Sequence, residues 1–126
     1  GPNSVLEEQA NAAMRVVITA EEIVDTDQIR RQPEATLISG LMVDAVVHLP
    51  YGAHPTGLFG YYDHDPAALA DYYAASHDQA SLAAWLDRFV HGTEDHWAYL
   101  DLFGMAHLSR LAVDPALGWR RERTDG

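Results

Sequence analysis

One histidine lies in a setting suited to chemistry. His54 occurs in the segment YGAHPTG, where Gly52 and Gly57 let the backbone approach a ligand closely and Pro55 stiffens the turn. An imidazole in such a loop can donate a hydrogen bond to a carbonyl group or accept a proton. The alternative is that His54 binds carbonyl groups of its own loop and holds the loop in shape. Both roles stay open, and His54 is the first candidate catalytic residue.

Two adjacent carboxylates are the second candidate. Glu21 and Glu22 lie within the segment RVVITAEEIV at residues 15–24, which is typical of a buried strand. A carboxylate near the C-terminal end of a parallel strand lies where ligands bind in open α/β folds. Neighbours in an extended chain point to opposite faces, however, so only one of the two can reach a given site. Capping or ion pairing is the favoured interpretation, and Glu22 is kept as the second catalytic candidate.

A metal site is not predicted. His64 lies between Asp63 and Asp65, but adjacent side chains seldom converge on one ion, and His64 has no histidine at a ligand spacing such as HExxH. Asp65 is better placed as the cap of a following helix. His91 and Asp95 are four residues apart, but Gly92 is expected to break the helix between them, so solvated helix ends explain both.

Charge and composition exclude several classes of protein. The formal net charge is −11, from 19 acidic residues and 8 arginines. Such a charge repels nucleic acid and anionic lipid surfaces, so neither is an expected partner. A C-terminal cluster, Arg120, Arg121 and Arg123, could neutralise a phosphate but is more often a solvated tail. No cysteine and no apolar run of bilayer length are present, which favours a cytoplasmic protein without thiol chemistry.

The length predicts a single domain. A chain of 126 residues can bury one modest core. Gly1 and Pro2 have the appearance of a remnant of a cleaved tag, so residues 1–4 are set aside and the native chain is expected to continue upstream. Residues 115–126 are expected to form a flexible tail.

The first half of the chain reads as strands with short helices. The pattern predicts a helix at 4–14, a strand at 15–24 covered on both faces, and a short helix at 27–31. Residues 37–49 are apolar and β-branched, and they are interpreted as two strand pieces joined by a bend. Residues 50–65 are rich in Pro and Gly and predict a long structured loop.

The second half reads as helical. A helical period begins at Pro66 behind its aspartate cap, with a break at 76–80 and an end at Gly92. A further helix is expected from Thr93, and Gly104 is a point at which it can be interrupted. The whole predicts an α/β fold in which a small, partly parallel sheet is flanked by helices and the C-terminal half is helical.

Four segments in this order resemble the A subunit of glutaconate-type class I CoA-transferases. They are RVVITAEEIV, VDAVVHLPYGAHPTG, GYYDHD and WLDRFVHGTEDHWAYL, and the most specific part is PYGAHPTG followed by GYYD. The resemblance runs from Met14 to about Leu111 and corresponds to the C-terminal part of such a subunit.

The resemblance implies a protein that handles acyl-CoA as a complex of A and B subunits. In transferases of this family a glutamate, usually of the B subunit, attacks the acyl-CoA thioester, and no position here can inherit that role. A CoA thioester is then a substrate, and no other cofactor is implied. The residues expected to line the substrate site are Tyr51, Gly52, His54, Gly57, Tyr61, Tyr62 and Asp63.

Three functions follow as hypotheses. The first is a CoA-transferase-like domain that binds or positions an acyl thioester without the covalent glutamate chemistry, and its partner would be a B-type subunit. The second is an accessory or docking domain of a larger acyl-processing protein, such as a polyketide synthase. The third is a small lyase or hydrolase that uses His54 and Glu22. Because so few strands leave a sheet edge unpaired, we also expect a homo-oligomer such as a homodimer, or association with neighbouring domains.

Overall fold

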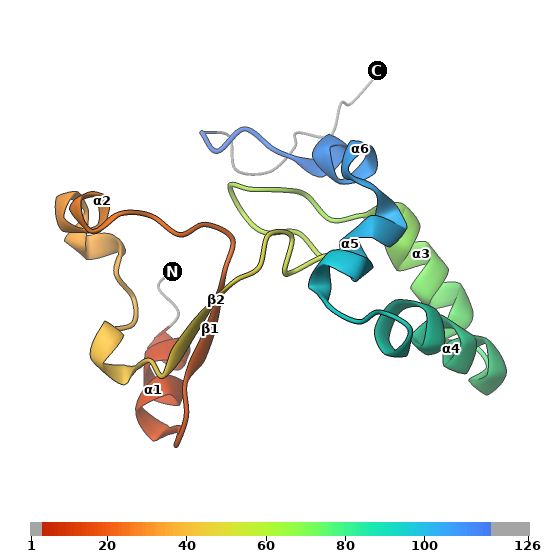
Figure 1. Ribbon diagram of the computed structural model, residues 1–126, viewed down its shortest axis with the longest axis horizontal. Helices are drawn as coiled ribbons and strands as arrows, with labels where there is room; N and C mark the ends of the chain where they lie inside the picture. Colours follow the sequence, from red (N-terminus) through yellow and green to blue (C-terminus); the bar gives the residue numbers. More distant parts are fainter. Residues whose placement is uncertain (1–3, 117–126) are drawn as a thin grey trace. The chain divides into compact units, whose positions relative to one another are not determined.

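The structure is a computed structural model that describes residues 4–116 (Figure 1). Residues 1–3 of the expected tag remnant and residues 117–126 of the expected tail, with the three clustered arginines, lie outside the described residues. The contacts of the chain divide it into two compact units, Gly1–Gly52 and Ala53–Gly126. Each unit is described by itself.

The first unit contains a two-stranded parallel sheet. Strands β1 (Val17–Ala20) and β2 (Ala45–His48) pair in register from Val17 with Ala45 to Ala20 with His48. The helical elements of this unit are α1 (Ser4–Ala12), α2 (Thr26–Arg31), η1 (Pro33–Ala35) and η2 (Gly40–Met42). The predicted parallel pairing and the predicted helices at both positions are confirmed.

Asp44 fastens the start of the two strands together. Its carboxylate accepts hydrogen bonds from the Val16 backbone N–H at 2.8 Å and from the Arg15 guanidinium at 2.9 Å. These two donors, the Val16 amide foremost, lower the pKa of Asp44. The acid that interrupts an apolar run in the sequence therefore has a local structural role.

Two sequence-based expectations for this unit are wrong. The first of the two strand pieces expected at 37–49 is instead the 3-10 turn η2, because the Ser39 hydroxyl accepts from the Leu41 N–H and so competes with strand pairing. Leu41 is 99% exposed. The strands are also not covered on both faces within residues 4–116, since Val17 is 62% exposed.

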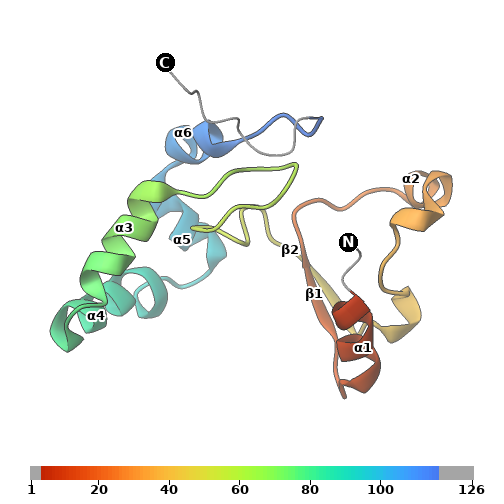
Figure 2. The same cartoon turned by 180° about the vertical axis from the view of Figure 1, so that it is seen from behind.

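The second unit is helical. It comprises α3 (Pro66–Ala75), α4 (Gln79–Leu86), the π-helical turn η3 (Asp87–His91), α5 (His96–Phe103), α6 (Met105–Leu108) and η4 (Ser109–Leu111). Helices α3 and α4 lie side by side in both views (Figure 1, Figure 2). The predicted breaks at 76–80, Gly92 and Gly104 are confirmed. The helix expected from Thr93 begins at His96, because the Asp95 carboxylate caps it by accepting from the Ala98 N–H at 2.8 Å.

The core of the second unit is small and includes Tyr62 of the loop. Its buried apolar residues are Tyr62, Phe89, Leu100, Leu108 and Leu111. Tyr62 ties the loop to this core: its backbone bridges Leu58 and Ala112, and its hydroxyl accepts from the Ala53 N–H at 2.8 Å. The predicted structured loop is confirmed. No helix within residues 4–116 is long and apolar enough to cross a membrane.

Candidate functional site

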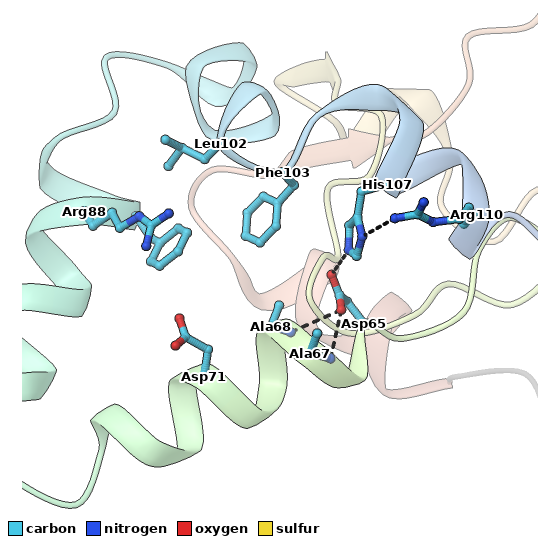
Figure 3. A pocket seen from close by; sticks show the side chains of 10 residues that line it. Asp65, Ala67, Ala68, Asp71, Arg88, Leu102, Phe103, His107 and Arg110 are labelled. Carbon is cyan, nitrogen blue, oxygen red and sulfur yellow. Dashed lines mark hydrogen bonds and ion pairs between the residues drawn. The ribbon is translucent and has the colours of Figure 1, made fainter.

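Two histidines of the second unit converge on one buried carboxylate. Oδ2 of Asp65 lies 3.1 Å from Nε2 of His54 and 2.5 Å from Nε2 of His107. The His54 side chain is fully buried, and Asp65 is 1% exposed. The pairing of Asp65 with His107 is visible in Figure 3. A single oxygen therefore joins the loop to α6.

The local sequence explains how Asp65 reaches this position. Its other oxygen, Oδ1, caps α3 by accepting from the N–H groups of Ala67 and Ala68 at 3.0 and 3.1 Å. Its backbone N–H donates to the Pro55 carbonyl at 2.9 Å, which brings the residue after His54 against the helix start. Both the predicted cap and the His54 contact thus depend on one aspartate.

The outer partners fix the direction of the hydrogen bonds. The Arg110 guanidinium donates to Nδ1 of His107 at 3.2 Å, so the hydrogen on Nε2 is directed to Asp65. On the other side, the Tyr99 hydroxyl lies 2.8 Å from Nδ1 of His54. With His54 donating from Nε2 to Asp65, its Nδ1 accepts from Tyr99. Every donor in the chain of hydrogen bonds therefore points toward Asp65.

The network shifts the acidity of its two ends. Burial raises the pKa of Asp65, but the hydrogen bonds from His107, the Ala68 amide and His54 outweigh it and bring the pKa from 3.8 to about 2. Burial, together with the negative charge of Asp65, raises the pKa of the Tyr99 hydroxyl to about 12. At neutral pH the site therefore holds a carboxylate and a protonated tyrosine, which suits support of the loop better than proton transfer.

We expect the stability of the second unit to fall in acid because of Asp65. The folded-state pKa of about 2 lies below the ordinary value of 3.8, so the unfolded chain takes up the proton first as the pH falls. The stabilisation is complete above that ordinary value and is lost as the pH falls through about 2. Carbon-13 NMR titration of the Asp65 carboxyl group measures its pKa in the folded chain. A pKa near 3.8 would contradict the expected contribution of Asp65 to stability.

Replacing Tyr99 with phenylalanine should destabilise the fold moderately. The ring contact with Phe103, at 5.2 Å between centroids, is kept, but Nδ1 of the buried His54 loses its partner. We expect a loss of about 1.5 kcal/mol in the free energy of unfolding. Urea unfolding followed by circular dichroism measures it. Tyr73→Phe, at an exposed tyrosine of the same unit, is the control and should change stability little.

A cavity of about 500 Å³ opens beside this network in the second unit. Figure 3 shows Phe103 between Arg88 on one side and His107 on the other. The remaining lining residues are Asp65, Ala67, Ala68, Asp71, Phe89, Leu102 and Arg110. The Arg88 guanidinium lies 4.8 Å from the Phe89 ring centroid and forms no ion pair with any described residue. The cavity thus combines the Arg88 guanidinium and an aromatic wall with the carboxylate of Asp71, so its lining is of mixed charge and an anionic group would have to bind on the Arg88 side.

In the first unit, Glu21 fixes the backbone that leaves β2. One carboxylate oxygen accepts from the Tyr51 N–H at 2.7 Å and the other from the Gly52 N–H at 2.9 Å. Tyr51 has a φ of 55°, a left-handed conformation that disfavours a side chain, and the charged acceptor offsets part of its cost. The capping role favoured for this carboxylate pair is what Glu21 performs, whereas Glu22 is exposed on the same unit.

The predicted site residues fall into two groups. His54 and Tyr62 are buried in the second unit, where both nitrogens of His54 and the hydroxyl of Tyr62 have protein partners. Tyr61 is exposed, and Asp63 accepts from the backbone and lies 2.9 Å from the ring of His64. Gly57 is half-buried. The members from the first unit are Tyr51, Gly52 and Glu22. Substrate contact by these residues stays a prediction.

Sequence reasoning missed the partners of His54. Tyr99, His107 and Arg110 were not among the candidates, although Tyr99 and Phe103 are four residues apart and so share one side of α5, with His107 following on α6 after the break at Gly104. That spacing was the available signal. The alternative role for His54, bonding to loop carbonyls, differs from the structure because its ring nitrogens bond to the side chains of Tyr99 and Asp65.

Comparison with known proteins identifies relatives for most of the chain. No protein-family model matches it. It is 40% identical over 115 residues to the A subunit of glutaconate CoA-transferase from Acidaminococcus fermentans, which covers 91% of this chain and 36% of that protein. It is 33% identical over 91 residues to the A subunit of 3-oxoadipate CoA-transferase from Pseudomonas knackmussii, covering 72% of this chain and 32% of that protein.

A solved structure shows the same relationship to the glutaconate CoA-transferases. The crystal structure of glutaconate coenzyme A-transferase from Acidaminococcus fermentans matches 93% of this chain with a TM-score of 0.84 and 39% identity, over 37% of the matched chain. The chain therefore spans about a third of the length of the curated relatives it matches. By sequence and fold, the chain is homologous to one segment of the A subunit of glutaconate-type CoA-transferases.

Proposed function

We propose that the chain acts as a segment of an A-type subunit that binds or positions an acyl-CoA thioester, in a complex with a B-type subunit. The observation that carries this proposal is the 40% identity over 91% of the chain to a subunit named as a CoA-transferase. The fold match with a TM-score of 0.84 supports it. The names of the relatives support a CoA thioester as the class of ligand.

The acids of the chain favour a positioning role over covalent chemistry. Asp65 is the buried carboxylate, and its two oxygens are occupied by two histidines and the first turn of α3. Both oxygens of Glu21 accept backbone N–H groups. A carboxylate so engaged is a weak nucleophile, because attack on a thioester would require it to give up these hydrogen bonds. The covalent step is therefore assigned to the partner subunit.

The cavity of the second unit is the proposed place for an anionic part of the ligand. CoA carries phosphate groups, and a guanidinium can bind a phosphate with two parallel hydrogen bonds. Arg88 forms no ion pair among the described residues, so its donors are available, and Phe89 and Phe103 supply apolar surface.

Calorimetric titration of the purified chain with CoA and acetyl-CoA tests the proposal. Saturable binding is expected, weakened about tenfold by Arg88→Gln. Arg30→Gln is the matched control, since Arg30 is exposed and paired with Asp27 in the first unit, and it should bind as the parent does. Equal binding by all three proteins would show that Arg88 does not contact the ligand. No heat of binding at millimolar ligand would contradict acyl-CoA binding by the chain.

Intact-protein mass spectrometry tests the absence of covalent chemistry. After incubation with acetyl-CoA the mass of the chain should be unchanged. A stable increase by the mass of an acyl group or of CoA, located on an acidic residue, would overturn that part of the proposal. The accessory-domain and small lyase or hydrolase alternatives are not favoured by any contact among the described residues.

A further inference from the structure

His107 links two oppositely charged groups on one side of the cavity of the second unit. Its Nε2 lies 2.5 Å from the Asp65 carboxylate, and its Nδ1 accepts from the Arg110 guanidinium at 3.2 Å. Arg88 lies on the other side of Phe103 (Figure 3). His107 and Arg110 both line the cavity, so a change at this histidine reaches the wall that faces a ligand.

The Arg110 guanidinium is bonded to an acceptor that carries no charge. Arg110 is exposed, and no carboxylate within residues 4–116 forms an ion pair with it. A neutral imidazole nitrogen accepts one hydrogen bond, whereas an oxyanion can accept two parallel bonds from a guanidinium. While His107 is neutral, the charges of Asp65 and Arg110 cancel. An anionic group then binds on the Arg88 side and gains little on this one.

Protonation of His107 reverses this arrangement. The proton enters at Nδ1, the nitrogen that accepts from Arg110, so the acceptor becomes a donor and two cations face each other. The hydrogen bond from Nε2 to Asp65 is kept and becomes an ion pair, which holds the imidazolium in place. The guanidinium is released from the ring, and this side of the cavity acquires a net positive charge.

His107 is the histidine of the network that can take up this proton. Its side chain is 30% exposed, whereas that of His54 is fully buried and would also lose the hydrogen bond from Tyr99 on protonation. The charged and titratable groups around His107 are Asp65 at the start of α3, Arg110 of η4, His54 of the loop and Tyr99 of α5 behind Asp65, and Asp71 of α3 and Arg88 of η3 across the cavity.

We propose that Arg110 is a second anion ligand of this cavity, and that His107 is the positioning residue that releases it on protonation. Binding of an anionic group by Arg110 and protonation of His107 then favour each other equally, because coupling between two bound species is reciprocal. A ligand with one anionic group at Arg88 can place another at Arg110 in acid. The inference rests on the proposed function only in taking a phosphate ester as the natural ligand.

Sulfate titrations test this coupling without any CoA. Inorganic sulfate is the probe because it stays a dianion between about pH 5 and 8, the range in which imidazoles ordinarily titrate. Nitrogen-15 NMR of the full chain, at constant ionic strength, follows the ring of His107 and the guanidinium of Arg110. Sulfate should bind at Arg110 about tenfold more tightly at about pH 5.5 than at about pH 8. Without sulfate, the two groups should change together as the pH is lowered.

Two variants should each abolish the gain in acid. His107→Gln keeps an N–H donor for Asp65 but takes up no proton, and Arg110→Gln removes the guanidinium; the backbone amides of α6 report sulfate binding in both. His77→Gln is the matched control. His77 is exposed in the same unit and its ring bonds to the backbone carbonyl of Tyr73, so this variant should keep the full gain.

Sulfate affinity that is equal at the two pH values would overturn the inference, as would a gain in acid that persists in His107→Gln or Arg110→Gln. If His107→Gln does not fold, the parent chain decides. An Arg110 guanidinium that is unchanged while the His107 ring takes up its proton contradicts the release.

The proposed function fails by a different result. A chain that shows the sulfate coupling but binds no CoA contradicts the proposed function and leaves this inference standing. A chain that binds CoA without the coupling contradicts this inference alone.

Discussion

Replacing Asp65 with alanine is expected to lower the free energy of unfolding of the second unit by about 4 kcal/mol, a large fraction of the stability of an ordinary domain. The substitution removes the acceptor of four hydrogen bonds, from His54, His107 and the N–H groups of Ala67 and Ala68. The side chain of His54 is fully buried, so its Nε2 would be left without a partner and without water. The lost helix cap adds to this cost.

Urea unfolding followed by tryptophan fluorescence measures the effect, because Trp85 and Trp97 both lie in the second unit. Asp78→Ala is the matched control: Asp78 caps α4 through two backbone N–H groups but contacts no histidine, and its carboxylate is exposed. Its loss should be clearly smaller. Equal losses in the two variants would mean that the histidine contacts contribute nothing beyond capping.

The part of this site that could be predicted from sequence is the part encoded locally. The Asp65 cap of α3 follows from an acid before Pro66 and a helical period after it, and the structure confirms it. The convergence of His54 and His107 on that cap spans 42 residues of sequence from Asp65 to His107, and no short-range pattern specifies it. Only the spacing of Tyr99 and Phe103 gave a signal, since it places both residues on one side of α5, and it does not indicate what that side faces.

The same division applies to the fold. Gly92 and Gly104 mark real interruptions, because a side chain at Gly92 would lie 2.4 Å from the Asp87 carbonyl oxygen and Gly104 has a φ of 78°. The strand piece expected before Asp44 is a 3-10 turn instead. Apolar and β-branched residues favour a strand where a sheet can bury their side chains, and none of residues 5–52 is buried. Several apolar residues of 15–24 and 37–49 are accordingly exposed, among them Val17, Leu41 and Val46.

The second unit carries the buried core and the network around Asp65, whereas none of residues 5–52 in the first unit is buried. The stability of the second unit should then be a property of its own core, which a core substitution can test.

Leu108→Ala is expected to cost about 3 kcal/mol of unfolding free energy, measured by the same urea unfolding. Leu108 is 0% exposed and belongs to α6, one residue after His107. Truncation leaves a cavity in the small core and loosens the helix that presents His107 to Asp65, so the acid dependence of stability should weaken as well. Leu102→Ala, at a partly exposed leucine of α5, is the matched control and should cost less than half as much. Equal costs at the two leucines would show that α6 does not anchor the core, and that the position of His107 is set by its hydrogen bonds alone.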